Sequence, residues 1–247
     1  MSDPERSPVA VVAAMREEFQ ALLARARDAR RDAHGFRIAR LGNVKVVLAA
    51  TGDGIRRARR GLAALCDTHR PGAIVGMGVA GALTNELSIF DVLVARRVLG
   101  EGAEAPPPDA AMASRALAIP GAREATFLTV PEPIVSRATR GALASSLGAD
   151  AVPVAVDMES AAWAREAAER RIPYALLRVV NDGADEELPA YLSRCTDAEG
   201  GIHRSRVALA ALCHPASTPA LSPMRRRVLE ASARLAAFVE HFLNASP

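Results

Sequence analysis

Aromatic side chains and cysteines are scarce in this chain of 247 residues. Phe, Tyr and Trp together make up 4% of the sequence, too few to supply the stacking platforms on which single-stranded nucleic-acid binders rely. The three cysteines, Cys66, Cys195 and Cys213, lie far apart, which argues against a disulfide framework and against a zinc knuckle. The composition therefore favours neither a protein that binds nucleic acid nor a small disulfide-rich domain.

Long hydrophobic runs and paired metal ligands are missing as well. No apolar segment approaches the ~20 residues needed to cross a bilayer. The chain starts with the polar run Met1-Ser2-Asp3-Pro4, which does not resemble a secretory signal. The five histidines are scattered, with no pair at metal-binding spacing. We therefore expect a cytoplasmic protein with reduced thiols, no bound metal and no cofactor.

Arginines cluster in two places, residues 25–31 and 225–227, although the net charge is only +3. The simplest interpretation is a solvated helix face. Clusters of this kind also attract anionic lipid weakly, so a peripheral contact with a membrane surface stays open.

Half of the residues are hydrophobic, which at this length suffices for one α/β domain whose sheet is covered on both faces. Amphipathic patterns predict helices over residues 17–31, 54–69, 134–147, 158–170 and 223–243. A loop is expected at 102–108, a polar stretch at 183–201, and a helical extension over 186–247. Apolar runs predict strands over 9–14, 36–41, 44–50, 73–78, 90–98, 123–129, 151–156 and 174–180, with a hairpin turn at Gly42-Asn43.

Two acidic residues stand directly after predicted buried strands. Glu159 opens a helix after the strand 151–156, and Asp182 ends the strand 174–180. Open α/β sheets hold their ligands at the carboxyl ends of strands, so this placement suggests a site. The alternative is that Glu159 only complements the positive end of a helix and Asp182 only forms a turn with Asn181 and Gly183. Residue types alone do not separate the two interpretations.

A glycine motif raises a different possibility. Gly76, Gly78 and Gly81 match the dinucleotide-binding fingerprint after a predicted strand. In that fold, however, the motif belongs to the first βαβ unit and an acidic residue ends the following strand, whereas here it is mid-chain and Asp91 precedes the strand. The Gly-x-Ser-x-Gly elbow of serine hydrolases is also absent.

Five short motifs follow one another in an order that is typical of a known superfamily. Together they resemble the nucleoside phosphorylase and nucleosidase superfamily over residues 9 to 185. The resemblance is closest to the branch of the methylthioadenosine/S-adenosylhomocysteine nucleosidases and the hopanoid-associated nucleosidase that acts on adenosylhopane. It implies one domain, residues 1–247, built as a three-layer α/β/α structure around a central twisted mixed sheet. The motifs are Ala14-Met15-Arg16-Glu17-Glu18, Thr51-Gly52-Asp53-Gly54, Gly78-Val79-Ala80-Gly81, Asp157-Met158-Glu159 and Arg178-Val179-Val180-Asn181-Asp182.

The resemblance implies separate roles for three carboxylates. Asp182 would protonate the base at a ring nitrogen, Glu159 would hold the ribose hydroxyls, and Glu18 would orient and deprotonate the attacking water. These residue types suit the reaction, because breaking an N-glycosidic bond builds positive charge on the sugar and negative charge on the base. The other substrate-binding residues that the resemblance implies are Met15, Gly52, Asp53, Val79, Ala80, Gly81, Pro133, Ile134, Asp157, Met158 and Asn181.

Water is favoured over phosphate as the nucleophile. Phosphorylases of the superfamily hold phosphate with an arginine and a serine at positions that are Gly76 and Val79 in this chain. Glu18 suits a general base and repels phosphate. We therefore expect an N-glycosyl hydrolase acting on a purine nucleoside, with phosphorolysis as the alternative.

Departures from the methylthioadenosine enzymes bear on the substrate. Pro133 replaces an aromatic residue that stacks on adenine, Asp53 replaces an apolar residue beside the 5′ substituent, and a closing loop is shortened to residues 100–109. An open 5′ side favours a bulky substituent, as in adenosylhopane, over the small one of methylthioadenosine.

A non-catalytic nucleoside-binding protein on the same scaffold is the alternative from another class. Such a protein needs neither a base for water nor an acid at the leaving group, so retention of Glu18, Glu159 and Asp182 argues against it. Superfamily members usually associate, so we expect a homodimer or another homo-oligomer.

Overall fold

The computed structural model describes residues 7–100, 102–147, 152–189 and 218–245. Residues 190–217, which belong to the predicted polar stretch and to the predicted helical extension, lie outside these ranges. In chain order, the elements are β1 (Val9–Ala13), α1 (Arg16–Leu23), β2 (Arg27–Arg31), β3 (Arg37–Leu41), β4 (Val44–Ala50), α2 (Ile55–His69), β5 (Ala73–Ala82), β6 (Val92–Gly100), β7 (Ala103–Glu104), α3 (Ala110–Leu117), β8 (Ala122–Thr129), α4 (Arg137–Ser146), β9 (Val154–Asp157), α5 (Ser160–Glu169), β10 (Tyr174–Asp182) and α8 (Thr218–Asn244).

All strands of the described residues belong to one mixed sheet. β4, β1, β5 and β10 run parallel to one another, while β2, β3 and β4 form an antiparallel edge. β5 also pairs with β9, and the series β5, β10, β6, β8 and β9 closes on itself. The predicted mixed sheet is therefore confirmed, and part of it forms a closed ring that the sequence patterns did not predict.

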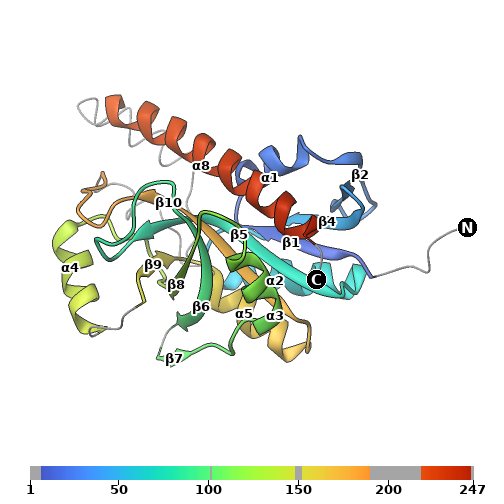
Figure 1. Cartoon of the computed structure of the whole chain (residues 1–247), viewed down its shortest axis with the longest axis horizontal. Coiled ribbons are helices and arrows are strands. Elements are labelled where there is room, and N and C mark those ends of the chain that lie inside the picture. The colour runs from blue at the N-terminus through green and yellow to red at the C-terminus, as the bar shows by residue number, and fades with distance from the viewer. Residues whose placement is uncertain (1–6, 101, 148–151, 190–217, 246–247) are drawn as a thin grey trace, which may run out of the picture.

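Helices cover both faces of the sheet, as expected for three layers (Figure 1). α2 and α5 bury their apolar sides against one face, where the largest buried side chain is that of Trp163. α1, α3 and α8 cover the opposite face, with Phe19, Met112 and Phe242 among the residues that pack there. In Figure 1, α8 runs along the outside of this second layer next to α1. This arrangement leaves the carboxyl ends of the parallel strands free for a site.

The N-terminal helix is shorter than predicted. α1 ends at Leu23 instead of residue 31, and residues 27–31 form the edge strand β2. The buried apolar positions of α1 stop at Leu22, so a longer helix would have buried nothing further. Most of the stability of a helix in a protein comes from packing of an apolar face, and residues 27–31 have none to bury. Pairing with β3 satisfies the backbone hydrogen bonds of this arginine-rich segment instead.

Other elements also differ from the prediction. β5 runs to Ala82 instead of residue 78, and the short strand β7 lies within the expected loop 102–108. α3 was not predicted at all; it begins behind Asp109, whose carboxylate accepts a hydrogen bond from the Met112 amide at 2.9 Å. α4 begins at Arg137, after the capping residue Ser136, rather than at residue 134. α8 begins at Thr218 instead of residue 223. Ile134, expected as the first residue of the helix 134–147, therefore lies before α4.

Candidate active site

The predicted site residues converge on one cavity of about 210 Å³ at the carboxyl ends of the parallel strands. Of the residues predicted from the sequence, only Gly52 and Asn181 lie outside its lining. Gly52 borders a neighbouring hollow, and Asn181 is buried with its Oδ1 unpaired within the described part of the chain. The predicted residues that line the cavity are Met15, Glu18, Asp53, Val79, Ala80, Gly81, Pro133, Ile134, Asp157, Met158, Glu159 and Asp182.

Glu18 reaches the cavity from the first turn of α1. Its side chain is buried, and its two oxygens accept hydrogen bonds from the Met15 amide at 2.8 Å and the Val79 amide at 3.1 Å. Burial raises the pKa of this carboxyl group, and the two amides and Arg178 partly oppose the rise. A Cβ atom at Gly78 would lie 2.8 Å from Glu18 Oε1, so glycine is needed beside this carboxylate.

Glu159 caps α5 two residues after the end of β9. Its Oε1 accepts a hydrogen bond from the Gly54 amide at 2.9 Å, which ties α5 to the start of α2. Burial raises the pKa of Glu159, the negative charge of Asp157 adds to this effect, and Arg178 opposes it. Among the described residues, the second oxygen of Glu159 has no protein hydrogen bond and is available to a ligand.

Asp157 lines the same cavity, but protein groups occupy both of its oxygens. Oδ1 accepts from the Thr129 hydroxyl at 2.8 Å, and Oδ2 accepts from Arg178 Nε at 2.8 Å and from the Ser160 hydroxyl. The side chain is thus held in place by β8, α5 and β10. We infer that Asp157 positions its neighbours, although the sequence predicted it as a substrate contact.

Asp182 ends β10, as predicted, and forms an ion pair with Arg140 of α4. Arg140 is almost fully buried, with 2% of its side chain exposed. Its five N–H donors are all used, because it also donates to the backbone oxygens of Ile134, Ala82 and Gly183. Arg140 therefore fixes Oδ2 of Asp182, while Oδ1 has no hydrogen bond to any described residue.

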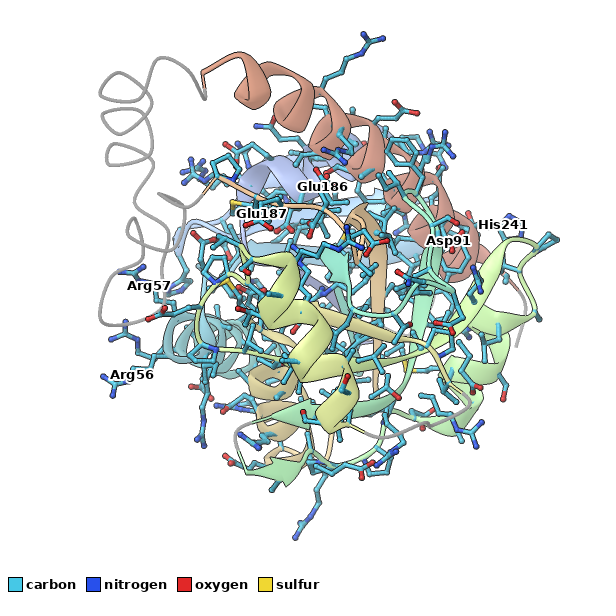
Figure 2. The ribbon with its side chains drawn as sticks, turned by 90° about the vertical axis from the view of Figure 1, so that its left-hand side faces the viewer. Arg56, Arg57, Asp91, Glu186, Glu187 and His241 are labelled. Atoms are coloured by element: carbon cyan, nitrogen blue, oxygen red, sulfur yellow. The ribbon has the colours of Figure 1, made fainter. Side chains whose placement is uncertain are left out.

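The segment after Asp182 is anchored from two sides. Glu187 accepts a hydrogen bond from the Arg137 amide at 2.9 Å, at the start of α4. Glu186 accepts hydrogen bonds from Nη1 and Nη2 of Arg227 of α8, at 2.8 and 2.7 Å, and lies next to Glu187 in Figure 2. This anchoring places Leu188 in the cavity wall.

Arg140 and Arg178 are the two functional candidates that the sequence analysis missed. Arg178 offered a signal, because an arginine within the apolar run 174–180 must be paired when the strand is buried. Arg140 offered none, since it stands in a helix with other arginines and small residues and nothing in the pattern marks it as buried.

The shortened loop 100–109, as far as it is described, folds back onto its own chain. The Ala105 amide donates to Val98 O at 2.8 Å, and the Tyr174 hydroxyl donates to Pro106 O. None of its described residues lines the cavity. The described part of the chain also contains no helix that is both long and apolar enough to cross a membrane.

Comparison with known proteins identifies the class. Residues 8–214 match the phosphorylase superfamily, and the chain belongs to this superfamily. Among solved structures it is similar to S-adenosylhomocysteine nucleosidase from Streptococcus pyogenes, with 20% identity, a TM-score of 0.74 and 100% coverage of both chains. It is also similar to 5′-methylthioadenosine/S-adenosylhomocysteine nucleosidase from Campylobacter jejuni, with 20% identity, a TM-score of 0.73 and coverage of 96% of this chain and 98% of that one.

A third similar structure is the futalosine hydrolase of Helicobacter pylori, with 16% identity, a TM-score of 0.73 and coverage of 97% of this chain and 98% of that one. At these identities the likeness shows the fold. The superfamily itself follows from the match over residues 8–214.

Proposed function

We propose that this chain is a nucleosidase that hydrolyses the N-glycosidic bond of an adenine nucleoside with a bulky 5′ substituent, of the adenosylhopane type. The observation that carries the proposal is the convergence of Glu18, Glu159 and Asp182 on one cavity in a member of the phosphorylase superfamily. Nucleosidases and a hydrolase among the structures with similar folds support the choice of reaction.

In the proposed reaction, the bond between the base nitrogen and the sugar carbon C1′ breaks and a water oxygen bonds to C1′. Glu18 takes the proton of the water, Asp182 delivers a proton to a ring nitrogen of the base, and Glu159 binds the ribose hydroxyls. The carboxylates also stabilise the positive charge that develops on the sugar. Arg140 orients Asp182 by holding its Oδ2.

Two features support water over phosphate. A Cβ atom at Gly76 would lie 2.8 Å from Trp163 Cε3, so the phosphate-binding arginine of the phosphorylases has no room at this position. Val79 offers no hydroxyl, and its amide already donates to Glu18. A buried carboxylate at the nucleophile's place repels phosphate.

We expect base release to be independent of phosphate. The test measures free adenine and free ribose product from 5′-substituted adenosines, in phosphate-free buffer and with added phosphate. Hydrolysis predicts equal rates and a product sugar without phosphate. Formation of a sugar 1-phosphate would contradict the proposal for water.

The same assay addresses the 5′ substituent. A bulky 5′ group should give the higher kcat/KM, since none of the described residues of the loop 100–109 closes the cavity. Methylthioadenosine cleavage is the second candidate, favoured by the similar structures. Faster turnover of methylthioadenosine would make it the better assignment.

The pH dependence tests the role of Glu18. A general base must be ionised, and burial raises the pKa of Glu18, so activity should be lost on the acid side as the pH falls through the raised pKa. We expect the acid limb of kcat/KM above the ordinary glutamate value of about 4.3. The measurement compares kcat/KM as a function of pH between the wild type and Glu18→Gln. A low-pH limb that persists unchanged in Glu18→Gln would assign the titration to another group.

A further inference from the structure

Two further hollows follow one another beside the active-site cavity. The cavity shares Ala14, Met15 and Asp53 with a hollow of about 400 Å³, here called the annex. The annex in turn shares Arg16 and Ala50 with a hollow of about 350 Å³ between α1 and the β2–β3 hairpin, here called the hairpin hollow. The three spaces therefore lie side by side along the ends of β1 and β4, away from Glu159 and Asp182, and their succession is here called the path.

The lining of the hairpin hollow is basic. Arg16, Arg31, Arg37 and His34 border it, and no carboxylate side chain of the described residues does. Asp32, which lies close in sequence, has other partners. Its carboxylate contacts His69 Nε2 at 2.6 Å and accepts hydrogen bonds from the backbone amides of His34 and Phe36. A concave surface of one sign concentrates the field and favours a counter-ion.

Arg31 and Arg37 lie directly opposite each other in the β2–β3 pair. Like charges in this position destabilise a sheet. Within the described ranges, neither guanidinium makes a hydrogen bond or an ion pair with the protein. The arginine fork matches the oxygens of a carboxylate or phosphate, so an anion bound between them would remove the repulsion.

A second arginine pair on the same hairpin shows the contrast. Arg27 and Arg40 also lie opposite each other, but each donates to a backbone carbonyl of the β3–β4 turn, Gly42 O at 3.2 Å and Asn43 O at 3.0 Å. Neither of them borders the hairpin hollow. The two pairs have equal charge and differ in whether the protein supplies acceptors.

We propose that the hairpin hollow is an anion-binding subsite for a phosphate or carboxylate group at the far end of the path taken by the 5′ substituent. The assignment of this path to the 5′ side rests on the proposed function. The anion has two possible sources: the end of the 5′ substituent itself, or a phospholipid headgroup beside a lipid-bearing nucleoside. Both present the same oxygens to Arg31 and Arg37.

The experiment compares the wild type with Arg31→Gln/Arg37→Gln and with the matched control Arg27→Gln/Arg40→Gln, which removes the same charge from the same strands. In the first arm, kcat/KM is measured for an adenosine with a long 5′-thioalkyl chain ending in a carboxylate and for its neutral methyl ester. If the substituent supplies the anion, the wild type prefers the carboxylate by about tenfold, equivalent to one charge-assisted contact. The variant at residues 31 and 37 loses this preference, and the control keeps it.

The second arm measures cosedimentation with phosphatidylcholine vesicles, with and without phosphatidylglycerol. If a headgroup supplies the anion, binding to the anionic vesicles depends on Arg31 and Arg37 and not on the control pair. Equal behaviour of the two double variants in both arms overturns the subsite. Melting temperatures close to the wild type are expected for both, because these side chains lie at the edge of the sheet and β2 is fully exposed.

The failure of the proposed function is recognised separately. If the wild type releases no base from either compound, the nucleosidase proposal fails. In that case the first arm is repeated as a binding measurement. Calorimetry gives the dissociation constants of the carboxylate compound and of its ester for the same three proteins. Tighter binding of the carboxylate that is lost only in Arg31→Gln/Arg37→Gln supports the subsite. If calorimetry shows no such difference and vesicle binding is also indifferent to this substitution, the subsite is excluded.

Discussion

Replacing Asp182 with asparagine should lower kcat by about 10²–10⁴, the range expected for loss of a general acid. Asn is nearly the same size and keeps one oxygen for Arg140, but it has no acidic proton to deliver to the departing base. The KM should change less than kcat, because the ribose contact of Glu159 is untouched. Initial rates of adenine release at saturating substrate measure the effect.

The structure supplies a control for this substitution. Asp185 stands three residues further along and forms an ion pair with Arg137 at 3.0 Å, in which 63% of its side chain is exposed. Asp185→Asn makes the same chemical change in the same segment, and exposed pairs contribute only about 0–1 kcal/mol. It should leave kcat within about twofold of the wild type. Near-normal turnover by Asp182→Asn would exclude the acid role.

A loss of kcat in Asp182→Asn has to be separated from a loss of structure. Arg140 is buried, and neutralising its partner leaves its charge less well compensated, so some destabilisation is expected. The variants Arg140→Lys and Arg140→Lys/Asp182→Asn test whether Arg140 affects kcat through Asp182. If Arg140 acts through Asp182, the lysine substitution lowers kcat in the wild type but has little further effect on kcat in Asp182→Asn. Independent effects of the two substitutions would make Arg140 purely structural.

Much of this arrangement was predictable because local patterns and tertiary contacts agree. Apolar runs place β9 and β10, and each ends where a polar or turn-forming residue follows, so Glu159 and Asp182 emerge at the expected edge. Gly42 adopts a φ of 55°, as the predicted hairpin turn requires. The motif order then relates Glu18 to the same cavity although it is far away in sequence.

The missed features depend on partners that are distant in sequence. β2 is a strand because β3 offers a free edge, and no pattern within residues 27–31 encodes that edge. Likewise, the closed ring needs β9 to pair with both β5 and β8. Arg140 is buried because the ends of β5 and β10 present carbonyls and a carboxylate to it. Such contacts exist only after the sheet has formed.

Arg178→Met should destabilise the fold by about 3–5 kcal/mol, because it removes one partner of a buried ion pair. Arg178 and Asp157 have side-chain exposures of 1% and 2%, and their closest nitrogen–oxygen distance is 2.7 Å. Arg178 also stacks on Trp163, with 4.9 Å from the guanidinium carbon to the ring centre. Methionine fills much of the space but leaves the charge of Asp157 uncompensated. Urea unfolding, followed by circular dichroism, measures the difference.

Arg96→Met is the matched control, since Arg96 forms an ion pair with Glu124 at 3.0 Å and 56% of its side chain is exposed. It should cost no more than about 1 kcal/mol. Arg178→Met/Asp157→Asn should recover part of the loss, because the uncompensated charge is then removed. A double variant that is no more stable than Arg178→Met would contradict the idea that the uncompensated charge of Asp157 causes the loss.

The same substitution should also change the pH profile, which links stability to the proposed chemistry. Arg178 lowers the pKa of both Glu18 and Glu159 against the effect of burial. Without it, both pKa values rise further, so Glu18 stays protonated over a wider range and the acid limb of kcat/KM moves to higher pH. Since Glu18 is proposed to act as a base, activity should then recover as the pH is raised. An unchanged acid limb in a folded Arg178→Met would mean that this arginine stabilises the sheet without tuning the carboxylates of the cavity.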